Sequence, residues 1–142
     1  MTISRNFQLY DESAYQVCMN ELAPMFKKVG ALYLSGPLGA GKTTWVRYLL
    51  RSLGYEGVVR SPTYTLFEVY ELPNFSVVHV DCYRMQSADE VALSGLDQYI
   101  DHALCCFEWP ELVANALPDP TWSVQLEYLA DGLGRRIYYQ VH

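Results

Sequence analysis

The chain of 142 residues is predicted to fold as an α/β domain around a mixed β-sheet, and three features of its sequence predict this. An apolar run at 31–35 leads into a glycine-rich loop that a helical pattern follows, which is typical of a strand–turn–helix unit. The run at 103–109 is mostly apolar, as expected for a central strand that is buried on both faces. Turn residues at 73–74 and 131–134 each separate two β-type runs, which predicts antiparallel hairpins beside a parallel centre.

The N-terminal part of the chain is predicted to form a strand followed by a helix. Residues 3–10 fit a short leading strand, and Asp11 with the acidic Glu12 favours a helix start at that point. Apolar residues then recur at spacings of three and four, as they do on one face of a helix. Pro24 lacks the backbone N–H that a helix interior needs, so we expect this helix to end or kink near residues 22–23.

The rest of the chain alternates between β-type runs and short helical segments. Gly54 fits the C-cap of the helix that follows the glycine-rich loop. We then expect strands at 64–72 and 76–82, short helices at 87–94, 96–101 and 110–116, a proline-rich linker at 117–120, and closing strands at 121–130 and 135–141. A chain of this length can bury a core of its own, so we expect a single domain over residues 1–142.

Composition and charge argue against several classes of protein. Hydrophobic residues make up 51% of the chain and charged residues 18%, which describes a folded protein and not a disordered one. The net charge of −6 offers no broad positive surface, so tight direct binding to DNA or RNA is not expected. Most of the arginines near the P-loop in sequence and near the end of the chain are accordingly interpreted as solvated surface residues, although they could contribute to RNA contacts within a complex: Arg47, Arg51, Arg60, Arg135 and Arg136.

The location of the protein is also constrained by the sequence. No stretch approaches the roughly 20 apolar residues of a membrane span, and the N-terminus lacks the apolar segment of a signal peptide. The four cysteines form no C-x-x-C pair and lie mainly in apolar runs, where reduced thiols pack as small hydrophobic groups. We therefore expect a cytoplasmic protein that does not associate with a membrane.

Residues 36–43, with the sequence GPLGAGKT, match the P-loop pattern G-x-x-x-x-G-K-[ST]. Side chains at positions 39 and 41 would block the approach of a phosphate to the inward-pointing amides. Lys42 would supply a positive charge to the β- and γ-phosphates, and Thr43 a hydroxyl to magnesium. An ordinary glycine-rich turn is the alternative, but the strand before it and the helix after it favour the P-loop. The expected nucleotide-binding residues here are Gly36, Leu38, Gly39, Ala40, Gly41, Lys42, Thr43 and Thr44.

Two acidic residues are candidates for the magnesium and hydrolysis site. Asp81 and Glu108 each follow an apolar run, so each carboxylate would emerge at the C-terminal edge of a strand, where α/β sheets bind their ligands. We expect one acid to bind Mg²⁺ and the other to position the attacking water, and the sequence leaves open which does which. A surface acid that closes a strand is the alternative for either residue. Because the guanine-binding pattern N-K-x-D is absent from the chain, ATP is the expected nucleotide.

Three further residues near these motifs have two interpretations each. Thr63 is either a switch-like hydroxyl that contacts magnesium or the γ-phosphate, or a threonine that caps a strand. Arg84 either neutralises charge in the transition state or pairs with the acids that follow it in the sequence. His79 shares one face of its strand with Asp81, and we interpret it as a hydrogen-bonded structural histidine in preference to a catalytic one.

Taken together, these motifs resemble the TsaE (YjeE) family of small bacterial P-loop ATPases. The resemblance covers roughly residues 11–130 and rests on the order and spacing of five segments: Gly36 to Thr44, Ser61-Pro62-Thr63-Tyr64, His79-x-Asp81-x-Tyr83-Arg84, Glu90 with Gly95-Leu96, and Glu108-Trp109-Pro110. It implies a three-layer α/β domain of the P-loop NTPase type with a mixed sheet.

The resemblance also implies a function and a set of site residues. The family assists the synthesis of threonylcarbamoyladenosine, a modification of the tRNA adenosine beside the anticodon, with the TsaB–TsaD complex, which transfers the group that TsaC makes. The implied cofactors are ATP and Mg²⁺, and tRNA would be met only through the complex. By motif, Lys42, Asp81 and Glu108 would serve catalysis, Thr43 would bind magnesium with one or both acids, and Thr63 and Trp109 would lie at the nucleotide.

One position departs from the family pattern. An acid usually follows the first P-loop glycine, and Pro37 stands there instead, which removes one backbone N–H and one negative charge. We expect an altered nucleotide affinity and not a loss of function. No arginine is clearly placed as a finger, a residue that contributes roughly 10³- to 10⁵-fold in rate, so we expect slow hydrolysis alone and acceleration by the partner complex.

Two other functions use the same residues. A small-molecule or nucleoside kinase also has a P-loop and magnesium, but it needs a lid over its acceptor, and the chain has no long arginine-rich insertion to form one. A non-enzymatic module would use bound nucleotide only to license docking. Transfer of phosphate to a metabolite would distinguish the kinase from an ATPase. The Glu108→Ala substitution would distinguish the docking module from an ATPase, because complex assembly should survive while turnover stops if hydrolysis matters.

Overall fold

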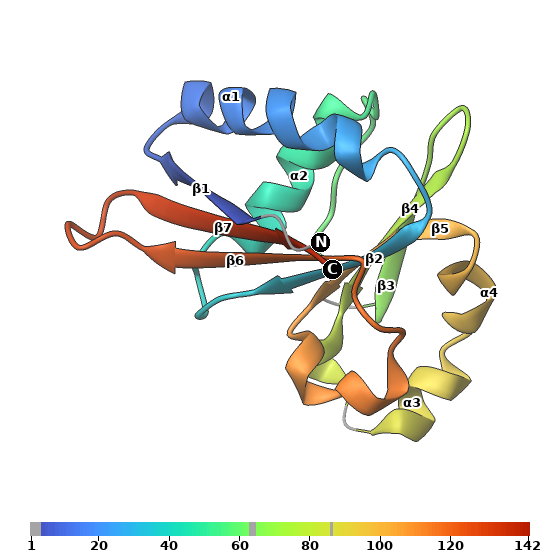
Figure 1. The fold of residues 1–142 in the computed structure, drawn as a ribbon. Helices are drawn as coiled ribbons and strands as arrows, with labels where there is room; N and C mark the ends of the chain where they lie inside the picture. The colour runs from blue at the N-terminus through green and yellow to red at the C-terminus, as the bar shows by residue number, and fades with distance from the viewer. Residues whose placement is uncertain (1–3, 63–64, 86) are drawn as a thin grey trace.

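The computed structural model describes residues 4–62, 65–85 and 87–142, and its strands form one seven-stranded sheet of order β1-β7-β6-β2-β5-β4-β3 (Figure 1). The strands are β1 (Ser4–Leu9), β2 (Gly30–Ser35), β3 (Phe67–Glu71), β4 (Ser76–Asp81), β5 (Ala103–Glu108), β6 (Trp122–Tyr128) and β7 (Arg135–Val141). The α-helices are α1 (Glu12–Leu22), α2 (Lys42–Ser52), α3 (Ala88–Leu93) and α4 (Asp97–Ile100). Short 3-10 turns are η1 (Ala23–Phe26), η2 (Cys82–Arg84), η3 (Pro110–Leu112) and η4 (Ala114–Ala116).

The centre of the sheet is parallel and its flanks are antiparallel. Strand β2 pairs in parallel with both β5 and β6, and β4 pairs in parallel with β5. The two hairpins, β3–β4 and β6–β7, pair antiparallel, as does β1 with β7. Both hairpins and the parallel centre are therefore confirmed. Because β2, β5 and β4 run in the same direction, their C-terminal ends meet at one edge of the sheet.

Helices cover both faces of the sheet, which confirms the three-layer α/β class (Figure 1). On one face lie α1 and α2, and Phe26 packs edge-on against Trp45 of α2 and Trp122 of β6, with ring centroids 5.8 Å and 5.2 Å apart. On the other face lie α3, α4 and the turns η3 and η4, over a second core cluster that includes Leu96 and Phe107. Every residue of β5 is buried, as its apolar sequence predicts.

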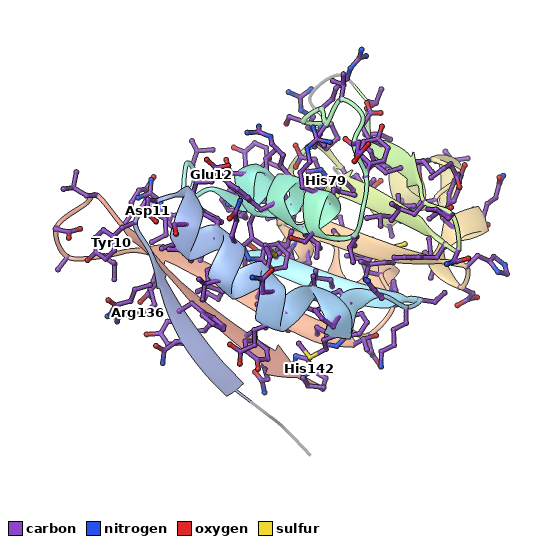
Figure 2. All side chains as sticks on the ribbon, turned by 90° about the horizontal axis from the view of Figure 1, so that it is seen from above. Tyr10, Asp11, Glu12, His79, Arg136 and His142 are labelled. Atoms are coloured by element: carbon purple, nitrogen blue, oxygen red, sulfur yellow. The ribbon has the colours of Figure 1, made fainter. Side chains whose placement is uncertain are left out.

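The first helix begins and ends where the sequence places it. Asp11 caps α1, since its carboxylate accepts a hydrogen bond of 2.9 Å from the backbone N–H of Ala14. Figure 2 shows Asp11 and Glu12 at the start of α1, beside Tyr10. The α-helix ends at Leu22, and Pro24 lies in the first turn of η1, where its missing N–H leaves no partner unsatisfied.

Some expected boundaries differ from the structure. Residues 110–116 form two 3-10 turns instead of one short helix, because the backbone of Val113 departs from helical geometry, with φ −137° and ψ 30°. The strand expected from residue 64 begins at Phe67, and residue 64 lies outside the described part of the chain. The helices expected at 87–94 and 96–101 are each shorter by one residue at both ends, and the strand expected at 121–130 spans Trp122–Tyr128. The closing strand at 135–141 has the expected bounds.

The cysteines are buried and unpaired, as the sequence predicts. Burial raises the pKa of the Cys18, Cys82 and Cys105 thiols to about 12, so these groups stay protonated and pack as small apolar side chains. Within the described residues, no helix has both the length and the apolar character that crossing a membrane requires.

Candidate active site

The P-loop connects β2 to α2 and needs glycine at two points because other chain segments approach it closely. A Cβ atom at Gly36 would lie 2.5 Å from the backbone oxygen of Leu126 in β6. One at Gly39 would lie 2.8 Å from the hydroxyl of Tyr128, and the backbone there has a φ of +78°, which side-chain-bearing residues rarely adopt. The predicted strand, glycine-rich turn and helix are all present in this order.

The first turn of α2 faces the inside of this loop. Its N-cap residue, Gly41, makes no side-chain hydrogen bond to the first amides of the helix. Trp45 and Leu49 are fully buried and hold the helix against the sheet. A helix start with uncapped N–H groups carries partial positive charge, so the geometry favours an anion at this position.

Lys42 is buried at the centre of the loop, with only 5% of its surface exposed. Its Nζ donates hydrogen bonds to the backbone oxygens of Gly36, at 2.7 Å, and Pro37, at 3.0 Å. The same atom lies 4.1 Å from the ring centroid of Trp109, in a cation–π contact. Burial lowers the pKa of Lys42, and the charge of the nearby Glu108 opposes that shift.

The two predicted acids meet at the C-terminal edge of the sheet. Asp81 of β4 and Glu108 of β5 are directly paired in the parallel register, so their Cα atoms stand side by side. The hydroxyl of Thr43 donates to Oε2 of Glu108 at 3.0 Å, and Oδ1 of Asp81 accepts from the backbone N–H of Tyr83 at 3.0 Å. Burial raises the pKa of Asp81, and the charge of Glu108 adds to the increase.

These groups line one pocket with a volume of about 480 Å³. Its lining includes the expected residues Leu38, Gly39, Gly41, Lys42, Thr43, Thr44, Asp81, Glu108 and Trp109, and adds Ser61, Tyr83 and Arg84. Gly36 and Ala40 belong to the loop but do not line the pocket, since Ala40 is buried and Gly36 presents its carbonyl to Lys42. Thr63 lies outside the described residues, and its near neighbour Ser61 is in the lining.

A family model matches most of this chain. The model, described as threonylcarbamoyl adenosine biosynthesis protein TsaE, matches residues 9–137. The chain belongs to the TsaE family. A relative from Haemophilus influenzae, named tRNA threonylcarbamoyladenosine biosynthesis protein TsaE, is 38% identical over 106 residues, which cover 74% of this chain and 67% of the relative. A relative of the same name from Bacillus subtilis is 35% identical over 113 residues, covering 78% of this chain and 70% of its own.

A solved structure has the same fold as this TsaE-family chain. The crystal structure of Bacillus subtilis YdiB superposes with a TM-score of 0.79 at 25% sequence identity. The superposition covers 99% of this chain and 87% of YdiB. The α/β fold of this chain is therefore shared with a protein whose structure is known from experiment.

Trp109 has an unusual backbone that brings its ring over Lys42. Its φ is 57° and its ψ is 44°, which lie in the left-handed region. No other non-glycine residue that the structure describes has a positive φ. This conformation costs of order 1 kcal/mol for a bulky side chain. The ring also contacts Tyr83, at 5.3 Å between centroids, so two aromatic side chains stand beside the predicted catalytic groups. No sequence pattern predicts this backbone conformation.

The β6–β7 hairpin holds the back of the P-loop through Tyr128 and Arg135, which we call the hairpin brace. The hydroxyl of Tyr128 donates to the backbone oxygen of Leu38, and Nε of Arg135 donates to that of Ala40, each at 3.2 Å. The guanidinium of Arg135 lies 4.1 Å from the ring centroid of Tyr128, so the two side chains also contact each other. Arg135 is therefore one of the arginines to which the solvated-surface interpretation does not apply.

The brace fixes the direction of two amides. In a trans peptide unit the C=O and the next N–H point in opposite directions. Side chains that hold the oxygens of Leu38 and Ala40 behind the loop therefore aim the N–H groups of Gly39 and Gly41 away from the hairpin, and both glycines line the pocket. No sequence motif marks the brace, because its residues lie 90 and 95 positions from the carbonyls that they bind.

His79 lies directly behind the acids. It is fully buried, and its Nε2 contacts Oε2 of Glu108, while its Nδ1 has no hydrogen-bond partner among the described residues. The expectation of a hydrogen-bonded histidine is confirmed. Its partner is one of the two predicted catalytic acids.

The donor set at this edge fits a magnesium ion that arrives with a nucleotide. Carboxylates and a hydroxyl are the hard oxygen ligands that Mg²⁺ prefers. Within the described residues no group of three or more histidine, cysteine or acidic side chains forms a metal cage. A site that binds Mg²⁺ together with a nucleotide needs only one or two protein carboxylates, because phosphates and water supply the other ligands. Thr43, Asp81 and Glu108 suit that arrangement.

Proposed function

We propose that this chain hydrolyses Mg-ATP at its P-loop, and that the hydrolysis supports threonylcarbamoyl modification of the tRNA adenosine beside the anticodon. One observation carries the proposal: Thr43, with its hydroxyl 3.0 Å from the Glu108 carboxylate, shares a pocket with the buried Lys42. Membership of the TsaE family supports the place of this activity in the modification pathway. The TsaB–TsaD complex is the proposed partner, and tRNA is met through it.

The phosphates are proposed to bind within the loop. The N–H groups aimed by the hairpin brace and the uncapped start of α2 supply donors, and Lys42 supplies positive charge. The oxygens of Gly36 and Pro37, which now accept from Lys42, would give way to the β- and γ-phosphate oxygens. Pro37 lacks an N–H, so its peptide contributes a carbonyl and no donor to this binding.

The hydrolysis step is proposed to use Asp81 and Glu108 at the C-terminal ends of β4 and β5, which we call the acid edge. Thr43 and Asp81 would hold the magnesium ion, which when bound neutralises negative charge on the β- and γ-phosphates. Glu108 is proposed to orient the attacking water and to accept its proton as the water oxygen bonds to the γ-phosphorus. The bond to the bridging oxygen breaks at the same time, and ADP leaves with the electron pair.

Two further groups in the pocket have proposed roles. Trp109, whose ring already contacts Lys42, is proposed to lie against the nucleotide. Arg84 lines the pocket from the turn after β4, where its charge faces the acid edge. We expect hydrolysis to be slow in the isolated protein and faster with the partner complex, because a correctly placed arginine finger adds roughly 10³- to 10⁵-fold.

The proposal is tested by steady-state phosphate release from Mg-ATP, measured with and without TsaB–TsaD and tRNA, for the wild type and Lys42→Ala. We expect low basal release that rises with the partners and is abolished by Lys42→Ala. Release that ignores the partners would remove the link to the modification complex. Transfer of the γ-phosphate to a metabolite instead of water would indicate a kinase.

A second experiment separates hydrolysis from nucleotide-dependent docking. The Glu108→Ala variant should still bind ATP and assemble with TsaB–TsaD, while repeated turnover of the modification stops. Unchanged turnover in this variant would show that bound nucleotide is sufficient and that the chain acts as a docking module.

A further inference from the structure

We propose that His79 is a positioning residue for Glu108, holding its carboxylate in the orientation that the hydrolysis step needs. The proposal rests on the proposed ATPase function, since it assigns a role within that reaction. It adds a buried residue, out of reach of the nucleotide, to the machinery of the site.

The first support is the way two donors converge on one carboxylate oxygen. Oε2 of Glu108 accepts from the hydroxyl of Thr43 at 3.0 Å and contacts Nε2 of His79. These donors come from different elements, α2 and β4, and they meet an acid at the end of β5. Their contacts therefore fix the direction of a side chain that otherwise has three rotatable bonds, and neither of them engages the other oxygen, Oε1.

The second support is the position of His79 in the sheet. His79 pairs with Cys106, and two residues later Asp81 pairs with Glu108. Alternate residues of a strand share one face of the sheet, so His79 lies on the same face as the two acids, two residues before them along β4. Thr43, which also contacts Oε2 of Glu108, lies in the first turn of α2. The ring is fully buried, so it acts on Glu108 from inside the protein, while the pocket lies on the other side of the carboxylate.

The third support is the hydrogen-bonding state that this geometry requires. An ionised carboxylate only accepts hydrogen bonds, so Nε2 of His79 must carry the proton in their contact. Nδ1 then holds a lone pair, and this atom is buried without a partner among the described residues. A buried lone pair left unpaired is tolerated more often than a buried N–H, so the unpartnered Nδ1 agrees with the same tautomer.

The role of His79 becomes more important once the site is loaded. The hydroxyl of Thr43 is the group proposed to meet magnesium, and it would then turn from Glu108 toward the metal. Of the two donors on Oε2, His79 would remain. Without it, the Glu108 carboxylate would be free to rotate away from the attacking water.

The kinetic test compares three substitutions. Glutamine at position 79 can place its amide N–H near the position of Nε2, asparagine reaches only the position of Nδ1, and leucine provides no donor. We expect His79→Gln to keep kcat within about 3-fold of the wild type, and His79→Asn and His79→Leu to lower it by about 10- to 100-fold, as loss of a supporting contact does. ATP affinity, measured with a fluorescent analogue, should stay within about 2-fold in all three variants, because His79 does not line the pocket.

A second measurement uses the intact protein without nucleotide or metal. Nitrogen-15 NMR of the His79 ring should show a proton on Nε2, and Glu108→Gln should move that signal. A ring that carries its proton only on Nδ1 would overturn the proposal, and so would equal kcat values for the glutamine, asparagine and leucine variants. A wild type that releases no phosphate even with its partners would instead refute the ATPase function, and the NMR result would still decide whether His79 holds Glu108.

Discussion

The two sides of the P-loop are built for different tasks. On one side lies the acid edge, which consists of Asp81 and Glu108 with His79 behind them, and its carboxylates line the pocket. On the other side lies the hairpin brace of Tyr128 and Arg135, which contacts only the back of the loop through two backbone oxygens. The acid edge can act on a bound nucleotide, whereas the brace sets the shape that receives it.

This difference separates turnover from affinity. Groups that meet charge as it develops in the transition state affect kcat, while groups that shape a binding loop affect ground and transition states alike. The acid edge is therefore expected to control the rate of hydrolysis, and the hairpin brace to control nucleotide binding. The following substitutions break one side at a time.

The largest effect is expected from Glu108→Gln. The amide keeps the shape of the side chain but is a far weaker base, so phosphate release at saturating ATP should fall by about 100-fold or more. Single-turnover release measures the chemical step directly. Loss of ATP binding in this variant would show that Glu108 serves affinity and would contradict the division between the two sides.

A smaller effect, on affinity, is expected from Arg135→Ala. Loss of the charged hydrogen bond to the oxygen of Ala40 should weaken ATP binding by about 10-fold, measured by equilibrium titration. Arg136→Ala is the matched control, since that neighbouring side chain bonds to Tyr138 and not to the loop. Equal effects of the two substitutions would indicate a general loss of positive charge instead of a local brace.

The Tyr128→Phe substitution should have a still smaller effect on affinity. It removes one neutral hydroxyl whose hydrogen bond to Leu38 is 3.2 Å long, so ATP binding should weaken by about 3-fold. Tyr138→Phe, in the next strand of the hairpin, provides the control because its hydroxyl accepts from Arg136. Wild-type affinity in Tyr128→Phe, together with weak binding in Arg135→Ala, would assign the brace to the arginine alone.

The smallest expected effect concerns stability. The pKa of Asp81 is raised in the folded state by burial and by the charge of Glu108, so the folded protein holds this proton more tightly than the unfolded chain does. The ionised carboxylate therefore destabilises the fold at neutral pH. Asp81→Asn keeps an acceptor for the N–H of Tyr83 and should raise Tm by about 2 °C at neutral pH.

The pH dependence checks the cause of this effect. The increase in Tm should shrink as pH falls and vanish below the ordinary Asp pKa of 3.8, where Asp81 is protonated in both states. Differential scanning calorimetry without magnesium measures it. An increase that is the same at every pH would trace the effect to packing and not to the charge.

The sequence predicts the acid edge far better than the brace. Asp81 and Glu108 each end an apolar run, and parallel strands bring such ends together, so local pattern and general topology are sufficient to place them. Lys42 and Thr43 follow from a contiguous motif. The order of the hairpins and the end of α1 before Pro24 were equally predictable, because turn residues and a missing N–H act locally.

The features that the sequence could not supply depend on distant contacts. Tyr128 and Arg135 bind the loop only because β6 pairs beside β2, and no local pattern records that neighbour. The left-handed backbone of Trp109 is held by packing around a side chain for which such a conformation is rare. The contact of His79 with Glu108 joins two strands and was visible in the sequence only as a shared face with Asp81.

The most direct test of the division between the two sides is the ATP-concentration dependence of phosphate release. It would be measured for the wild type, Glu108→Gln and Arg135→Ala, each with Mg²⁺ and the partner complex. We expect Glu108→Gln to lower kcat with little change in KM, and Arg135→Ala to raise KM with kcat nearly kept. A wild type without activity, or two variants that lower kcat to the same extent with KM unchanged, would contradict it.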